Sequence, residues 1–242
     1  MICENGVCYV QGGQKKKQSR AKLQTLAAIF HTVTLCWYLY VWTWHFTSDT
    51  ARVLPGASGF GRFFRYLTFY SYTLQLIQLL ASFCCHLPKA LRIPAAENFA
   101  DDLSCAVFGL ANVVTCMFYL IDAATNDVVE GGKVDHQRPP WLGVSVHFIN
   151  SVVAWLDILL SHPRSFSRRS QNLSIGLVIF YLHWILLCSF MNGSFPYPFL
   201  NKLPQPQGFI GVSVGGVCLF VSLFRLGKWL MTPIQTWKVK DL

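Results

Sequence analysis

Polar side chains recur at helical spacing inside strongly apolar stretches of this chain. In residues 63–87 and again from residue 141 onward, they follow offsets of 0, 3, 7, 10 and 14, with one alanine in the second series. Such offsets place side chains on one face of an α-helix. The first series is Thr68, Ser71, Gln75, Gln78 and Ser82, and the second is His147, Asn150, Ala154, Asp157 and Ser161. A third stripe holds Asn112, Thr115, Tyr119 and Asp122.

Thr68 and His147 are residue types that together could perform nucleophilic catalysis. Thr68 is the sixth residue of its stretch and His147 the seventh of its own. If the two helices run in the same direction, both side chains lie roughly 8–9 Å below the same membrane boundary. A neutral imidazole can accept the proton of a threonine hydroxyl and so activate its oxygen. The alternative is structural, because membrane threonines bond the carbonyl one turn back and membrane histidines bond neighbouring helices.

Four further residues are candidates for supporting or binding roles. Asp157 lies near the inner end of its helix, where a carboxylate opposes the helix dipole. We therefore expect it to pair with a basic group, with Arg225 as a candidate. Asn150 or a backbone N–H near the outer end of a span could stabilise an oxyanion. Arg62 and Arg65 could hold a substrate carboxylate at the outer mouth, or they could anchor the helix at the interface.

The composition is that of a chain whose solvent is lipid. Hydrophobic residues make up 53% of the 242 positions and charged residues only 13%, about half the charged fraction of a soluble domain. The charges gather in short patches between long apolar stretches. The basic residues behind the net charge of +9 flank these stretches, which argues against nucleic-acid binding. The nine cysteines show no metal-ligand spacing, so neither a metal nor another cofactor is expected.

The apolar stretches predict an all-α polytopic membrane protein built as one six-helix bundle. Each stretch has about the 20 residues that a membrane-spanning helix needs, and prolines, glycines and charges separate them. The predicted spans are 23–46, 63–87, 103–123, 141–160, 173–192 and 207–230. The bundle domain thus covers residues 23–230, between a basic tail at 1–22 and a short tail at 231–242.

The distribution of lysine and arginine predicts which side each loop occupies. With a cytosolic N-terminus, fourteen of these residues fall on the cytosolic side and six on the other. Cytosolic loops carry the excess of positive charge in membrane proteins. We therefore expect both termini in the cytosol and an endoplasmic reticulum or plasma membrane location.

Three segments resemble a known family in their order along the chain. They are FFRYLTFYSYTLQLIQ, then PPWLGVSVHFINSVVAWLDILL, then NGSFPYPFLNKL. Together they resemble the androgen-induced protein family, with rolling-stone-like proteins as distant relatives. The resemblance covers roughly residues 58–205 and implies a six-span intramembrane threonine hydrolase that cleaves fatty acid esters of hydroxy fatty acids. Carried over by position, the nucleophile falls on Thr68, the histidine on His147 and the acidic residue on Asp157.

Two other functions remain open from the sequence. The likeness to rolling-stone-like proteins suggests a non-enzymatic role in adhesion, fusion or signalling, which would tolerate loss of Thr68 and His147. A small transporter is the other alternative, although the sequence has no inverted repeat and no paired broken helices at mid-membrane. The expected partners are a lipid substrate and the bilayer, and the sequence leaves the oligomeric state undetermined.

Overall fold

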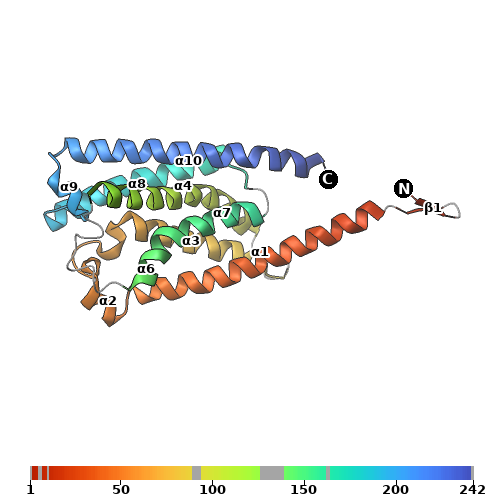
Figure 1. Ribbon diagram of the computed structural model, residues 1–242, viewed down its shortest axis with the longest axis horizontal. Coiled ribbons are helices and arrows are strands. Elements are labelled where there is room, and N and C mark those ends of the chain that lie inside the picture. Colours follow the sequence, from red (N-terminus) through yellow and green to blue (C-terminus); the bar gives the residue numbers. More distant parts are fainter. Residues whose placement is uncertain are drawn as a thin grey trace.

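The protein is a bundle of long helices (Figure 1). The computed structural model describes residues 2–4, 7–9, 11–88, 94–125, 139–161 and 164–240. The helices are α1 (Gln11–Trp44), α2 (Ser48–Val53), α3 (Leu67–Cys84), α4 (Pro94–Thr125), α6 (Pro140–Val144), α7 (Asn150–Leu160), α8 (Arg168–Asn192), α9 (Pro198–Lys202) and α10 (Gln207–Lys240). Short 3-10 helices cover Pro55–Ala57 and Arg62–Arg65, and a π-helical turn covers Ser145–Ile149. Strands β1 (Ile2–Glu4) and β2 (Val7–Tyr9) form an antiparallel hairpin.

Five described helices are long and apolar enough to cross a membrane. They are Ala21–Trp44, Ala95–Ala123, Pro140–Leu160, Arg168–Asn192 and Gln207–Pro233. Each overlaps one predicted span, so the prediction of an all-α polytopic membrane protein is confirmed. The remaining predicted span, 63–87, corresponds to α3, which is only 18 residues long and carries two buried glutamines. Because α1 enters and α10 leaves the bundle at the same end (Figure 1), an even number of crossings fits the fold, but the count of six stays a prediction.

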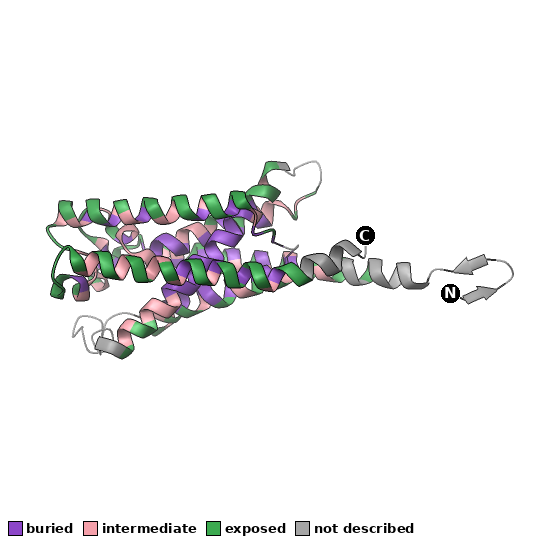
Figure 2. Ribbon diagram, turned by 90° about the horizontal axis from the view of Figure 1, so that it is seen from above, coloured by how far each residue is buried: buried purple, intermediate pink, exposed green. Residues whose placement is uncertain are grey.

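Helix α4 forms the centre of the bundle. It packs against α3, α7, α8 and α10, and every residue from 102 to 114 is buried. By contrast, α10 lies on the outside, and only 11% of its most apolar stretch is buried inside the protein (Figure 2). Exposed apolar faces of this kind can contact lipid chains, which are as apolar as the side chains themselves. Because α4 contacts both α3 and α7, it holds the side chains of these two helices in a fixed relation to one another.

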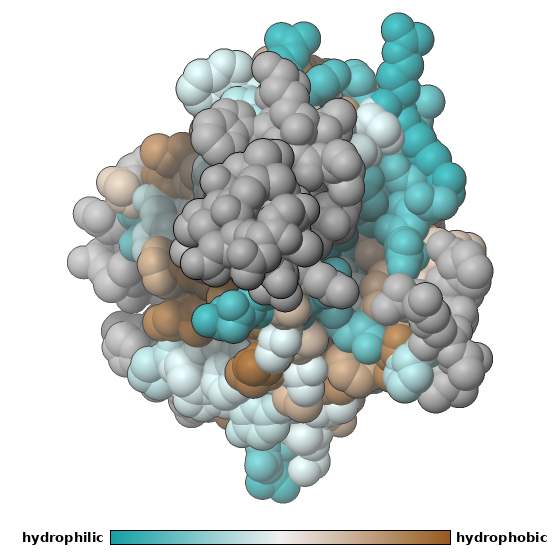
Figure 3. All heavy atoms as spheres, turned by 90° about the vertical axis from the view of Figure 1, so that its right-hand side faces the viewer, coloured by the Kyte–Doolittle hydropathy of each residue, from teal (hydrophilic) through white to brown (hydrophobic). Residues whose placement is uncertain are grey.

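The first and last helices extend beyond the predicted spans. Helix α1 begins at Gln11 and α10 continues to Lys240, whereas the predicted spans begin at residue 23 and end at residue 230. Lysine, glutamine and arginine are good helix formers, so a helix can continue into water where hydropathy has already fallen. Seen from the end at which α1 enters and α10 leaves the bundle, much of the rim of the molecule carries hydrophilic side chains (Figure 3). Hydropathy locates a membrane boundary, and it does not locate the end of a helix.

Candidate active site

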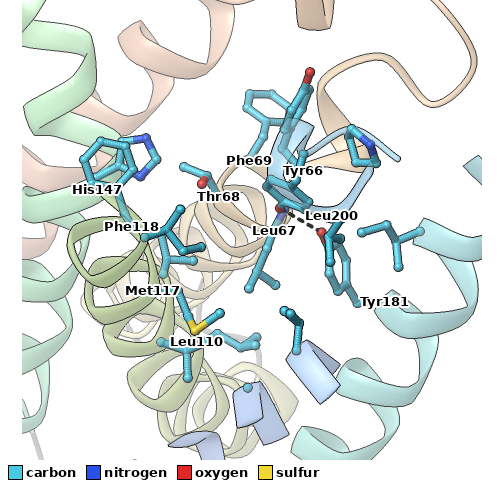
Figure 4. A pocket seen from close by; sticks show the side chains of 18 of the residues that line it. Tyr66, Leu67, Thr68, Phe69, Leu110, Met117, Phe118, His147, Tyr181 and Leu200 are labelled. Atoms are coloured by element: carbon cyan, nitrogen blue, oxygen red, sulfur yellow. Dashed lines mark hydrogen bonds between the residues drawn. The ribbon is translucent and has the colours of Figure 1, made fainter. Parts of the chain in front are cut away.

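A cavity of about 730 Å³ lies at the end of the bundle opposite to the end at which α1 enters. Apolar side chains from α3, α4, α8, α9 and α10 form most of its walls. The polar and titratable residues that line it are Thr68, His147, His45, Tyr66, Tyr181, Tyr197, Ser213 and Lys202. The structure thus brings to one cavity the two residues for which the predicted spans give equal depth. In Figure 4 the Thr68 side chain extends towards the His147 ring.

Thr68 is the second residue of α3 and therefore lies in its first turn. The first N–H groups of a helix have no carbonyl partner one turn back, and they give this end a partial positive charge. The backbone approaches this turn through a left-handed Gly61 with φ of +80° and the 3-10 helix that follows. A nucleophile in the first turn of a helix lies beside N–H groups that can bind a developing oxyanion. Of the two kinds of oxyanion donor expected from the sequence, the backbone donors are thus adjacent to Thr68.

His147 lies in the middle of the π-helical turn. Its residue is only 7% exposed, and its ring stacks on Phe118 of α4 with centroids 3.7 Å apart and an interplanar angle of 13°. The Thr115 hydroxyl donates a hydrogen bond to the His147 carbonyl. Single π-helical turns occur frequently at functional sites, because they redirect one side chain within a helix. The sequence carries no signal for this turn, and it was not predicted.

Asn150 lies one turn beyond His147 and is fully buried, but it does not line the cavity. Its Oδ1 accepts the Ser151 N–H at 2.6 Å and the Thr115 hydroxyl at 3.3 Å. Its carbonyl accepts from Gln75 Nε2 at 3.0 Å. Thr115 consequently contacts both His147 and Asn150. This arrangement suits the predicted supporting role, whereas a direct oxyanion contact does not follow from it.

Asp157 lies at the far end of α7 and is the centre of a buried ionic cluster. Its Oδ1 is 2.8 Å from Arg164 Nη2 and 2.8 Å from His31 Nε2. Ser161 and Ser104 also donate to the carboxylate. The prediction that Asp157 pairs with Arg225 is therefore wrong. Its partner is Arg164, which follows α7 and is buried against the carboxylate. Two further residues contact this group: Arg164 Nη2 is 3.2 Å from Ser82 Oγ, and His31 Nδ1 is 2.8 Å from His86 Nε2. We name the whole set the Asp157 cluster; it consists of Asp157, Arg164, His31, Ser161, Ser104, Ser82 and His86.

The Asp157 cluster lies away from the cavity. Asp157 follows His147 by ten residues, a separation of roughly 15 Å along a helix, and it does not line the cavity. The charge of Asp157 raises the pKa of Arg164, although burial acts to lower it. Arg164 therefore remains protonated beside the carboxylate, and the cluster joins α1, α3, α4 and α7 through a satisfied ion pair.

Neither Arg62 nor Arg65 lines the cavity. Arg62 is exposed, and its Nε donates to the Ala57 carbonyl at 3.1 Å, while the Arg65 guanidinium lies 5.4 Å from the Tyr66 ring centroid. Among the described residues along the cavity, Lys202 of α9 is the one lysine or arginine. Sequence reasoning overlooked it, although it lies in the third segment of the family resemblance.

Comparisons with known proteins agree with this architecture. The sequence profile of a family described as FAR-17a/AIG1-like protein matches residues 26–232. The androgen-dependent TFPI-regulating protein of Homo sapiens is 22% identical over 226 residues, covering 90% of this chain and 96% of that protein. A protein of Schizosaccharomyces pombe named as a UPF0641 membrane protein is 23% identical over 195 residues, covering 79% of this chain and 84% of its own length. No solved structure matches the chain.

Proposed function

Because this chain belongs to the FAR-17a/AIG1-like family, we propose that it is an intramembrane lipid ester hydrolase with Thr68 as the nucleophile. The resemblance seen in the sequence is thereby confirmed at the level of the family. One observation carries the proposal: Thr68 and His147, far apart in the chain, line the same largely apolar cavity, and the Thr68 side chain extends towards the imidazole. An acyl transfer site needs a nucleophile beside a base, in a volume that admits the substrate and restricts water.

The proposed reaction has two halves. Thr68 Oγ1 attacks the ester carbonyl carbon while His147 accepts the hydroxyl proton, and the N–H groups of the first turn of α3 stabilise the oxyanion. The bond from carbon to the alcohol oxygen then breaks, and His147 returns the proton to the departing alcohol. Water, deprotonated by His147, then attacks the acyl-threonine carbonyl; the bond from carbon to Thr68 Oγ1 breaks, His147 returns the proton to that oxygen, and the fatty acid leaves. In each half His147 takes up one proton and then releases it, so the cycle needs no cofactor.

The cavity suits a lipid ester that also carries an anionic group. Its volume of about 730 Å³ falls within the roughly 300–1,000 Å³ typical of small-molecule sites, and its apolar walls match hydrocarbon chains. A fatty acid ester of a hydroxy fatty acid has two such chains and a free carboxylate several bonds from the ester. Lys202 at the cavity wall is the proposed partner of that carboxylate, with Arg62 and Arg65 as the alternatives. With cytosolic termini, the cavity opens on the opposite side of the membrane.

The test compares hydrolysis of a hydroxy-fatty-acid ester by purified wild type, Thr68→Ala and His147→Ala, at matched folded concentration. The chain offers matched controls. Thr73 lies on the same helix, bonds the Phe69 carbonyl at 2.8 Å and does not line the cavity, and His183 is an exposed histidine of α8. We expect Thr68→Ala to lower kcat about a thousandfold or more, while Thr73→Ala and His183→Ala stay near wild type.

Two results would contradict the proposal. Activity that persists in Thr68→Ala would remove the nucleophile and require a different site. A wild-type protein that hydrolyses neither hydroxy-fatty-acid esters nor simpler long-chain esters would favour the non-enzymatic role in adhesion, fusion or signalling.

A further inference from the structure

Two tyrosines from distant parts of the sequence are hydrogen-bonded to the start of α3. The Leu67 N–H donates to the Tyr197 hydroxyl oxygen at 2.7 Å, and the Tyr181 hydroxyl donates to the Arg65 carbonyl at 3.1 Å. The two hydroxyl oxygens are 3.0 Å apart. Because the Tyr181 proton is directed to Arg65, Tyr197 must be the donor between them. The chain of hydrogen bonds therefore leaves the backbone at Leu67 and returns to it at Arg65, two residues earlier.

This chain replaces a cap that the local sequence lacks. The residue before α3 is Tyr66, and its side chain makes no capping hydrogen bond, whereas helices usually begin with serine, threonine, aspartate or asparagine in that role. The Tyr197 hydroxyl satisfies one of the orphan N–H groups of the first turn instead. It comes from the residue before α9, about 130 positions away. The direction in which α3 begins is thus set by tertiary contacts.

The same contacts form one wall of the cavity. Tyr181, Tyr197 and Leu67 line it together with Thr68, which follows Leu67 directly; in the view of Figure 4, Leu67 lies between Thr68 and Tyr181. Trp184 of α8 adds a hydrogen bond from its Nε1 to the Phe64 carbonyl at 3.0 Å. The backbone before the nucleophile is therefore held by α8 at two carbonyls and by Tyr197 at one N–H.

Tyr197 is suited to act as a permanent donor. Burial raises its pKa to about 12, so its hydroxyl keeps the proton that it donates to Tyr181 throughout the physiological range. Pro198 follows at the first position of α9, where its fixed φ restricts the backbone next to Tyr197.

We propose that Tyr197, acting with Tyr181, is a positioning residue for Thr68. The two hydroxyls form a tyrosine latch that holds the first turn of α3, so that Thr68 Oγ1 and the neighbouring N–H groups face the bound ester. This inference rests on the proposed function of Thr68. A misplacement of about 1 Å in a catalytic geometry can cost about a hundredfold in rate, so removing one hydroxyl should affect kcat far more than KM.

The experiment measures kcat, KM and thermal unfolding for Tyr197→Phe, Tyr181→Phe and the double variant. Tyr70→Phe is the matched control, because Tyr70 lies on α3, donates to the Leu177 carbonyl of α8 at 3.1 Å and does not line the cavity. We expect each latch variant to lower kcat about ten- to a hundredfold with KM within about threefold. The double variant should be no worse than the more severe single one, because both interrupt one chain. Tyr70→Phe should lose some stability with kcat unchanged.

A second readout does not depend on activity. Hydrogen exchange of the amides at residues 67–69 should accelerate in Tyr197→Phe and remain unchanged in Tyr70→Phe. Equal kcat and equal exchange in the two variants would overturn the latch. If Thr68→Ala is inactive while both latch variants keep full activity, the latch is wrong and the proposed function stands. If Thr68→Ala is active, the proposed function fails, and the exchange data alone decide whether the tyrosines hold this turn.

Discussion

The cavity and the Asp157 cluster are both buried in the same bundle, but they differ in how their polar groups are satisfied. Around Asp157, one carboxylate accepts from Arg164, His31, Ser161 and Ser104. Around Thr68, the walls are mainly apolar, and His147 lines the same cavity. A saturated buried network fixes packing, whereas a few polar groups in a mainly apolar cavity are typical of a ligand site.

The segment Pro140–Leu160 contributes to both regions. His147 belongs to the cavity and Asp157, ten residues later, to the cluster. The carboxylate therefore cannot orient the imidazole as the acid of a catalytic triad does, although it follows His147 in the same stripe. We infer that one end of this segment carries the chemistry and the other end holds the helices together.

The largest expected effect separates two buried histidines. His147→Ala should lower the hydrolysis rate about 10²- to 10⁴-fold, because it removes the proposed base. His31→Ala should instead lower the unfolding temperature and leave the rate per folded molecule unchanged, because His31 contacts Asp157 and not the cavity. Activity assays paired with thermal unfolding in detergent measure both. A fall in rate for His31→Ala comparable to that for His147→Ala would show that the two regions are not separate.

The next effect concerns the ion pair itself. Arg164→Met should destabilise the fold by about 3–5 kcal/mol, because it leaves the Asp157 charge buried without its partner. Arg168→Met, at an exposed arginine that begins α8, should change stability by less than about 0.5 kcal/mol. Since the folded pKa of Arg164 is raised, its contribution is complete below the unfolded pKa and is lost only as the pH rises through the folded value. The stability difference between wild type and Arg164→Met should therefore show no change from Arg164 ionisation between pH 6 and 9.

A smaller effect tests the charge at the cavity. Lys202→Met should raise KM roughly three- to tenfold for a substrate with a free carboxylate, which corresponds to about 1 kcal/mol for an exposed charge. The methyl ester of the same substrate should show no change, and Lys202→Arg should restore the acid substrate. If Arg62→Met or Arg65→Met raises KM instead, the substrate carboxylate binds at the outer mouth beside these arginines, as predicted from the sequence.

The smallest effect contrasts two buried serines. Ser71 is fully buried, and its hydroxyl has no hydrogen-bond partner in the described parts of the chain, whereas Ser104 donates to Asp157. Ser71→Ala should stabilise the fold by up to about 1 kcal/mol, and Ser104→Ala should destabilise it by about 1–2 kcal/mol. Thermal unfolding of both variants measures the difference. Destabilisation by Ser71→Ala would indicate that its hydroxyl has an ordered partner, such as a water molecule.

Composition and periodicity determined the class of the protein and much of its internal order. The apolar stretches identified the membrane helices, because lipid forces each span to be long and apolar. The stripes on α3 and on Pro140–Leu160 identified Thr68 and His147 as inward-facing, because 3.6 residues per turn decides which side chains share a face. The position of these two side chains in one cavity follows from the packing of both segments around α4.

Only the tertiary structure decided the partners that come from outside the helical pattern. Arg164, rather than Arg225, pairs with Asp157 because a loop folds back, and a loop has no period from which its direction can be inferred. The same holds for Lys202, which α9 brings to the cavity, and for the π-helical turn that aims His147. The sequence by itself therefore determined which helices exist and which faces point inward. The cavity and its latch depended on contacts between residues such as Leu67 and Tyr197, whose separation of 130 positions carries no local signal.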